Sequence, residues 1–177
     1  MSKLYIPKPK AGEYNSVWDT YYATVDEGDI HQLLISQGKQ ISDLYSSLTE
    51  EQSLYRYAEG KWSLKDVLGH IIDTERLMTY RILVAGRGDL TPMPRHADVY
   101  VSLTHFDRRP LQDLIEEYRT VRAASASLIH GLTEAEIKQF GILNEVKTSA
   151  AAGAYFILGH AQHHINVVHE RYLPRLT

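Results

Sequence analysis

Four long stretches of this chain carry apolar residues three or four positions apart, with polar residues between them. Such spacing places the apolar side chains on one face of an α-helix, and that face must pack against other helices to leave water. In the first stretch, Leu34, Ile41 and Leu44 share one face. Four such helices joined in sequence indicate an all-α four-helix bundle. The predicted helices span residues 29–47, 63–85, 110–129 and 148–172.

The ends of these helices carry start and stop signals. Ser63 can accept a hydrogen bond from the first turn of the second helix, and Gly86 and Gly88 end that helix. Pro110 suits the first turn of the third helix, because its fixed φ angle is already helical. Pro174 prevents the fourth helix from continuing.

Two parts of the chain lack a helical period. Residues 1–25 are expected to form an extended lead-in, and residues 86–109 a long connection between the second and third helices. A connection of this length usually has a function or is disordered. Residues 100–103 could form a strand, but one strand makes no sheet, so no sheet is expected. We therefore expect one domain over residues 1–177, a helical bundle with a lead-in.

The composition excludes several classes of protein. The chain has no cysteine, which excludes disulfides, a cysteine nucleophile and every zinc site built with cysteine. The net charge of −3 argues against nucleic-acid binding by broad phosphate neutralisation. No apolar run reaches the roughly 18 residues of a membrane span, and the start lacks the apolar core of a signal peptide. We therefore expect a cytoplasmic protein that binds no membrane.

The chain has nine histidines but no cysteine, and four of the histidines lie within residues 160–169. A helix turns by about 100° per residue, and this geometry sorts the four into two groups. His160 lies at one side of the apolar face and His164 inside it, whereas His163 and His169 fall outside it. His160 and His164 are one turn apart, roughly 6 Å along the axis, so both imidazoles can reach one divalent ion.

A third histidine occupies the matching position of the second helix. The tripeptide Leu-Gly-His ends at His70 in the second helix and at His160 in the fourth. A glycine inside a helix costs roughly 1 kcal/mol against alanine, so its use at both places suggests the close approach of another segment or a ligand. If the two helices are neighbours, His70, His160 and His164 form a three-histidine metal site with an open coordination position. The alternative is that these are ordinary hydrogen-bonded core histidines.

Two charged residues of the second helix, Glu75 and Arg81, fall on its buried side. Buried charges need partners. The simpler interpretation is an internal ion pair of Glu75 with Arg81, Arg119 or Arg122. In the functional interpretation, Arg81 holds the carboxylate of an anionic substrate and Glu75 is a candidate general base.

Four motifs of the chain match one known family. They lie at residues 60–63, 67–76, 159–165 and 170–174, and shorter matching pieces lie at residues 80–81, 88–89 and 117–122. Through these motifs, nearly the whole chain resembles the DinB/YfiT-like superfamily of metal-dependent four-helix-bundle proteins. The resemblance implies that the metal ligands are His70, His160 and His164. It also implies a divalent metal ion, with Zn or Ni as the first expectation and Fe or Mn as alternatives.

The resemblance leaves the reaction open among three functions. Members of the family include transferases that use bacillithiol, mycothiol or glutathione, so the leading expectation is a small-molecule transferase with a low-molecular-weight thiol cosubstrate. Because this chain has no cysteine, any thiol must come from that cosubstrate. The alternatives are a metal-dependent hydrolase and a metal-stabilised dimeric bundle without catalysis. Dimers are common in the family, so a homodimer is expected.

Overall fold

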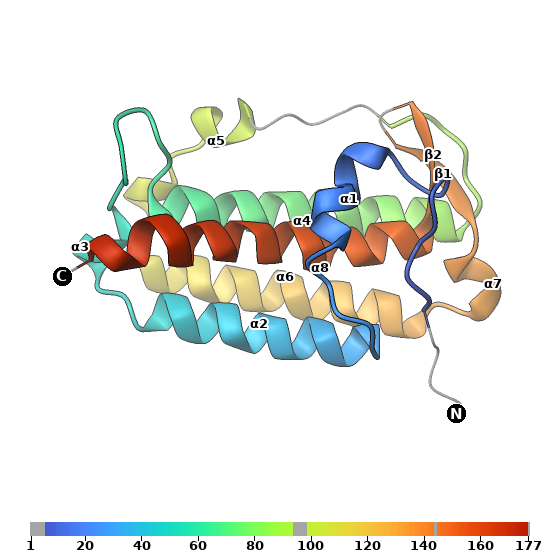
Figure 1. The fold of residues 1–177 in the computed structure, drawn as a ribbon, viewed down its shortest axis with the longest axis horizontal. Coiled ribbons are helices and arrows are strands. Elements are labelled where there is room, and N and C mark those ends of the chain that lie inside the picture. The colour runs from blue at the N-terminus through green and yellow to red at the C-terminus, as the bar shows by residue number, and fades with distance from the viewer. Residues whose placement is uncertain (1–5, 94–98, 144, 177) are drawn as a thin grey trace.

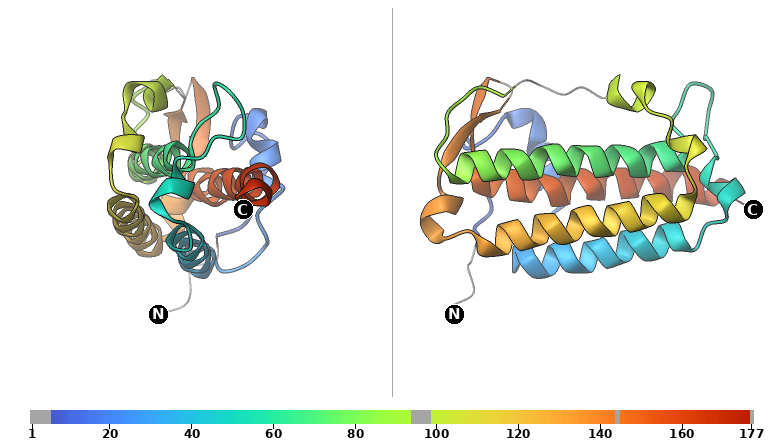
Figure 2. Two further views of the ribbon diagram at one scale, coloured as in Figure 1. Left: turned by 90° about the vertical axis from the view of Figure 1, so that its left-hand side faces the viewer. Right: turned by 180° about the vertical axis from the view of Figure 1, so that it is seen from behind.

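The computed structural model describes residues 6–93, 99–143 and 145–176. Four long helices, α2 (Ile30–Ser46), α4 (Leu64–Gly86), α6 (Leu111–Gly131) and α8 (Ala150–Val167), run side by side along the molecule (Figure 1). α4 packs against both α6 and α8, and α2 packs mainly against α6. Figure 2 looks along the bundle and shows α4 and α8 in one layer, with α2 and α6 in the other. This arrangement confirms the predicted four-helix bundle.

Shorter helices and two strands connect the four long helices, and the bounds of all these elements are as follows. The helices are α1 (Asp19–Tyr22), α2 (Ile30–Ser46), α3 (Glu50–Ser53), α4 (Leu64–Gly86), α5 (Val99–Leu103), α6 (Leu111–Gly131), α7 (Glu134–Ile137) and α8 (Ala150–Val167). The strands are β1 (Phe140–Leu143) and β2 (Val146–Ser149). None of the helices within the described ranges is long and apolar enough to cross a membrane.

The predicted helix starts agree with the structure to within two residues. The hydroxyl of Ser63 accepts a hydrogen bond from the N–H of Asp66, and the carboxylate of Asp66 accepts one from the N–H of Ser63. This reciprocal pair is a capping box. α6 begins directly after Pro110, where the carboxylate of Glu50 accepts the otherwise orphaned N–H of Leu111.

The last helix changes its winding near its end. α8 gives way to a π-helical turn (Val168–Tyr172) and then to a 3-10 turn (Leu173–Arg175) that contains Pro174. The predicted fourth helix, which ends near Tyr172, therefore corresponds to α8 together with the π-helical turn. Such turns are rare and often lie near functional sites.

A two-stranded antiparallel sheet crosses one end of the bundle, where the sequence predicts no sheet. β1 pairs with β2 over their whole length. Alternate residues of β1 are buried, and Gly141 lies against Ala85 of α4. The expectation of no sheet is wrong because strands of four residues are too short for an alternating pattern to stand out in the sequence.

Two connecting segments cover the side of the bundle formed by α4 and α8 (Figure 1). The lead-in is not simply extended, because it contains a 3-10 turn (Ser16–Trp18) and α1, which packs on α8. The connection between α4 and α6 contains α5, where a strand is the alternative from the sequence, and a 3-10 turn (Phe106–Arg108). Residues 94–98 of this connection lie outside the described residues.

Two helix glycines are the places where these covering segments dock. A Cβ on Gly69 would lie 2.4 Å from the ring of Phe106, and a Cβ on Gly159 would lie 2.5 Å from the carbonyl oxygen of Tyr21. Neither site has room for a methyl group. The expected close approach at both glycines is therefore confirmed, and the approaching group is another segment of the chain.

A polar network crosses the apolar core and touches all four long helices. The carboxylate of Glu75 on α4 accepts hydrogen bonds of 2.8 Å from both Nε and Nη2 of Arg122 on α6. Nη1 of Arg122 donates to the side-chain oxygen of Gln37 on α2, over 3.0 Å. The Nε2 of Gln37 donates in turn to the carbonyl of Leu158 on α8, over 3.0 Å. Of the three arginines offered by the sequence, Arg122 is thus the partner of Glu75.

Replacing Arg122 by Met should strongly lower the free energy of unfolding, because the change leaves the Glu75 carboxylate buried without its partner. Breaking a buried ion pair from one side costs about 3–5 kcal/mol. Unfolding in urea measures the loss. Arg119→Met on the same helix is the matched control, since Arg119 pairs with Glu116 at the surface. The control should stay within about 0.5 kcal/mol of the parent protein, and equal losses in the two variants would contradict the role of the network.

Replacing Gly159 by Ala should also destabilise the fold, although alanine is the better helix former. The new methyl group must push the backbone at Tyr21 off α8, and such overpacking costs about 1–3 kcal/mol. Gly131→Ala is the control, because nothing lies within 4 Å of a Cβ built there. The melting temperature of Gly159→Ala should be lower than that of the parent protein, and the melting temperature of Gly131→Ala should be equal to it or higher. If Gly159→Ala were as stable as Gly131→Ala, the docking of α1 would be looser than this packing indicates.

Candidate metal centre

Three histidines meet between α4 and α8. The Nε2 atoms of His70 and His160 are 3.0 Å apart, and those of His160 and His164 are 3.1 Å apart. One ring nitrogen from each residue lies within 4.8 Å of the other two. His70 and His160 are buried, and His164 is partly buried. The structure thus brings together the three histidines that the sequence singles out.

Hydrogen bonding alone gives a poor account of this cluster. The Nε2 of His160 faces the Nε2 atoms of both His70 and His164. A neutral imidazole nitrogen carries either one hydrogen or one lone pair, so it cannot be a full partner to both neighbours. A cation placed among the three nitrogens would instead use a lone pair from each ring.

The surroundings keep the two histidines of α8 uncharged near neutral pH. Burial lowers the pKa of His160 well below its ordinary range, and the neighbouring His164 and His70 lower it further. Burial and the neighbouring His70 also lower the pKa of His164, to about 3. Neutral imidazoles are the form that binds a metal ion, so this environment favours ligation over protonation.

Aromatic side chains form walls around the three histidines. The ring of Phe156 stacks on the ring of His160, with 5.3 Å between centroids. The ring of Trp62 lies 4.8 Å from that of His70, and the ring of Tyr21 lies 5.7 Å from that of His160. These walls limit the access of water to the nitrogen atoms.

The other two histidines of residues 160–169 lie outside the group, as the helical angles predict. His163 and His169 are both exposed. The ring centroid of His163 is 5.2 Å from that of His164, but no hydrogen bond joins the two rings in the described structure. The dense histidine cluster in the sequence therefore contributes two residues to the site.

Glu75, the candidate general base, lies near the histidines but is already engaged. It borders a small hollow that also touches His160. Its two carboxylate oxygens accept three hydrogen bonds of 2.8–3.1 Å from Arg122. A carboxylate held in this way orients the helices and has little capacity left to accept a proton from a substrate.

Arg81, the candidate anion ligand, is not brought to the histidines. It is buried in α4, and burial lowers its pKa below the ordinary range of arginine. It follows His70 by 11 positions along the same helix, roughly 16 Å along the axis. The structure therefore assigns it no contact with the three histidines.

The geometry of the three histidines fits a divalent metal ion. Two imidazole nitrogens that bind one ion at about 2.0–2.1 Å lie roughly 3 Å apart, which matches the two Nε2 separations of 3.0 and 3.1 Å. Neutral imidazoles suit Zn, Ni, Cu or Fe. Three protein ligands leave a coordination position open for water or a substrate, as in catalytic metal sites.

The sequence does not reveal which side chains would form the walls. Tyr21 comes from a segment with no helical period, and Trp62 comes from the loop before the second helix. The available signal is the glycine before His70 and the glycine before His160, since each marks a place where another segment approaches.

Two proteins with related folds or sequences carry names that refer to a metal. The fold matches the solved structure of YfiT from Bacillus subtilis, "a probable metal-dependent hydrolase with an unusual four-helix bundle topology". The TM-score is 0.72 at 14% identity, over 93% of this chain and 90% of the other. The "Putative metal-dependent hydrolase OB0413" of Oceanobacillus iheyensis is 22% identical over 142 residues, which cover 77% of this chain and 82% of that protein.

A family model supports the same relationship. It matches residues 33–168, a range that includes all three histidines and most of the four long helices. The family that this model describes is the DinB superfamily. Because the match covers well over half of the sequence, the chain belongs to the DinB superfamily.

Proposed function

We propose that this protein is a metal-dependent enzyme that binds a divalent ion through His70, His160 and His164. The observation that carries the proposal is the convergence of three Nε2 atoms that hydrogen bonds cannot satisfy together. The names of the two related proteins support it, since both refer to a metal-dependent hydrolase. We expect a small-molecule substrate, because the aromatic rings of Phe156, Trp62 and Tyr21 surround the three histidines.

The ion would supply the nucleophile. When bound by the three histidines, a divalent ion would lower the pKa of a water or thiol, so that its anion is available as a nucleophile. The chain's own residues hold the ion, keep its ligands neutral and limit the access of water. The chain has no cysteine, and the Glu75 carboxylate is bound to Arg122, so neither a thiol of the chain nor Glu75 replaces the ion in this role.

Two reactions fit this arrangement. The leading proposal is transfer of a low-molecular-weight thiol cosubstrate to an electrophilic small molecule, as the family resemblance implies. The second is metal-dependent hydrolysis, which the names of the two related proteins favour. Both reactions need the same ion at the same histidines.

Protein purified without a histidine tag should contain about one divalent ion per chain, measured by inductively coupled plasma mass spectrometry. His160→Ala should lose most of it, because His160 lies between the other two ligands. His169→Ala is the matched control, since His169 is on the same helical segment and exposed. Metal near zero in the parent protein, or equal metal in His160→Ala, would contradict the proposed site.

The metal-loaded protein should catalyse one of the two reactions. Glutathione with an aryl halide tests thiol transfer, and a panel of activated esters and amides tests hydrolysis. Activity should fall by at least about 100-fold in His160→Ala, since changes behind the ligands alone cost about 10–100-fold. His169→Ala should retain it. If EDTA lowers the melting temperature sharply while both assays stay silent, the protein is a metal-stabilised bundle and the enzymatic proposal is wrong.

A further inference from the structure

A second cavity lies beside the metal centre, at the end of the bundle where α4 begins. Its volume is about 590 Å³, which falls within the range of small-molecule sites, about 300–1,000 Å³. Its walls come from the loop before α4, from the first turn of α4 and from residues 101–108. Its lining includes none of the three histidines.

Trp62 is the wall that this cavity shares with the metal centre. Trp62 lines the cavity, and the centroid of its indole lies 4.8 Å from that of the His70 ring and 6.2 Å from that of the His164 ring. Phe106 forms another part of the lining, and its ring fills the notch at Gly69, next to His70. A molecule in the cavity would therefore lie one indole ring away from the three histidines, against a wall fixed to the same turn of α4.

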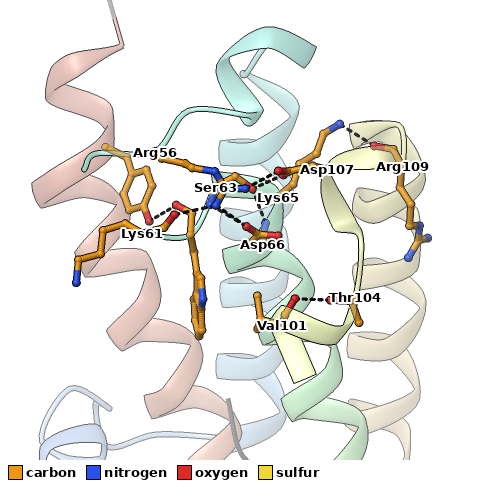
Figure 3. A network of polar contacts seen from close by, with 11 residues as sticks. Arg56, Lys61, Ser63, Lys65, Asp66, Val101, Thr104, Asp107 and Arg109 are labelled. Atoms are coloured by element: carbon orange, nitrogen blue, oxygen red, sulfur yellow. Dashed lines mark hydrogen bonds and ion pairs between the residues drawn. The ribbon is translucent and has the colours of Figure 1, made fainter. Parts of the chain in front are cut away.

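The acidic residues of the cavity are already engaged by internal partners (Figure 3). Asp66 accepts hydrogen bonds from Arg56, over 2.8 Å, and from the N–H of Ser63. Asp107 accepts hydrogen bonds of 2.5 Å from the other guanidinium nitrogen of Arg56 and from the hydroxyl of Ser63. Arg56 and Ser63 thus both donate hydrogen bonds to each of the two carboxylates.

Two further cations of the lining have no acidic partner among the described residues. Arg108 and Lys61 both line the cavity, and Figure 3 shows the Lys61 side chain pointing away from Asp66 and Asp107. Both residues are exposed. With Arg56, the lining carries three permanent cations against two carboxylates, on a chain whose net charge is −3. The unengaged charge of the cavity is therefore positive.

We propose that this cavity is a binding subsite for the carboxylate or phosphate group of a small-molecule reactant. Arg108 binds the anionic group, Lys61 adds attraction, and the face of Trp62 contacts the rest of the molecule. Identifying the bound molecule as a reactant rests on the proposed function, but the binding of the anion does not require the metal ion.

Nuclear magnetic resonance of the two tryptophan indole N–H groups tests the subsite. Trp62 reports on the cavity, and Trp18, which lies in a different part of the core, is the internal control. Succinate and inorganic phosphate are the anionic probes, and succinamide is the uncharged match for succinate. The titrations use both metal-free and zinc-loaded protein, so that a failure of the metal site is seen separately by metal analysis.

The proposal expects a saturable shift of the Trp62 resonance, an unchanged Trp18 resonance and no response to succinamide. A response to succinate alone identifies a carboxylate subsite, and a response to phosphate alone identifies a phosphate subsite. Arg108→Gln should weaken the binding about fivefold, as expected for one exposed charge contact. Lys138→Gln, which removes an exposed cation far from the cavity, should leave the binding unchanged.

Three results would overturn the subsite. These are an unmoved Trp62 resonance with both anions, equal shifts with succinamide and succinate, and equal weakening in Arg108→Gln and Lys138→Gln. The last result would show attraction by overall charge only.

Discussion

The buried ion pair between Glu75 and Arg122 is the interaction on which the arrangement of the four helices depends. Taking two charges out of water costs several kcal/mol for each ion, so the pair is stable only because its hydrogen bonds are well satisfied. Burial opposes the charge of Arg122, but the adjacent Glu75 raises its pKa above the ordinary range of arginine. Arg122 also packs into a notch at Gly38 of α2, where a Cβ would lie 2.8 Å from its side chain. A slip of one helix along another would separate these groups and leave a charge unpaired.

This network also fixes the register of the helices at the three histidines. Gln37 binds the carbonyl of Leu158, two residues before His160, while Glu75 lies five residues after His70. The two ends of the network therefore hold α4 and α8 within about two turns of the histidines that they contribute. Glu75 therefore has a structural role, because both of its carboxylate oxygens accept hydrogen bonds from Arg122 and hold α4 against α6.

Much of the site follows from the sequence because it depends on local helix geometry. His160 and His164 can be selected by angle since α8 is regular around them, and the repeated Leu-Gly-His adds His70. The partner of Glu75 does not follow, because the choice among three arginines depends on how α6 is rotated against α4. The β1–β2 hairpin is missed because its strands are short. Gly69 and Gly159 indicate that another segment approaches closely, but the sequence does not identify Phe106 and Tyr21 as the approaching residues.

The long helices and the connecting segments contribute different residues to the site and its surroundings. The helices supply the three histidines and the ion pair, and changes there leave charges or ligands without partners. Trp62, Phe106 and Tyr21 instead come from segments outside the long helices, and functional variation concentrates in such connections. Gly69 and Gly159 fix where two of these segments dock, so new side chains can be placed beside the ligands without moving the helices. The three histidines and the side chains that surround them from the connections therefore come from separate parts of the chain.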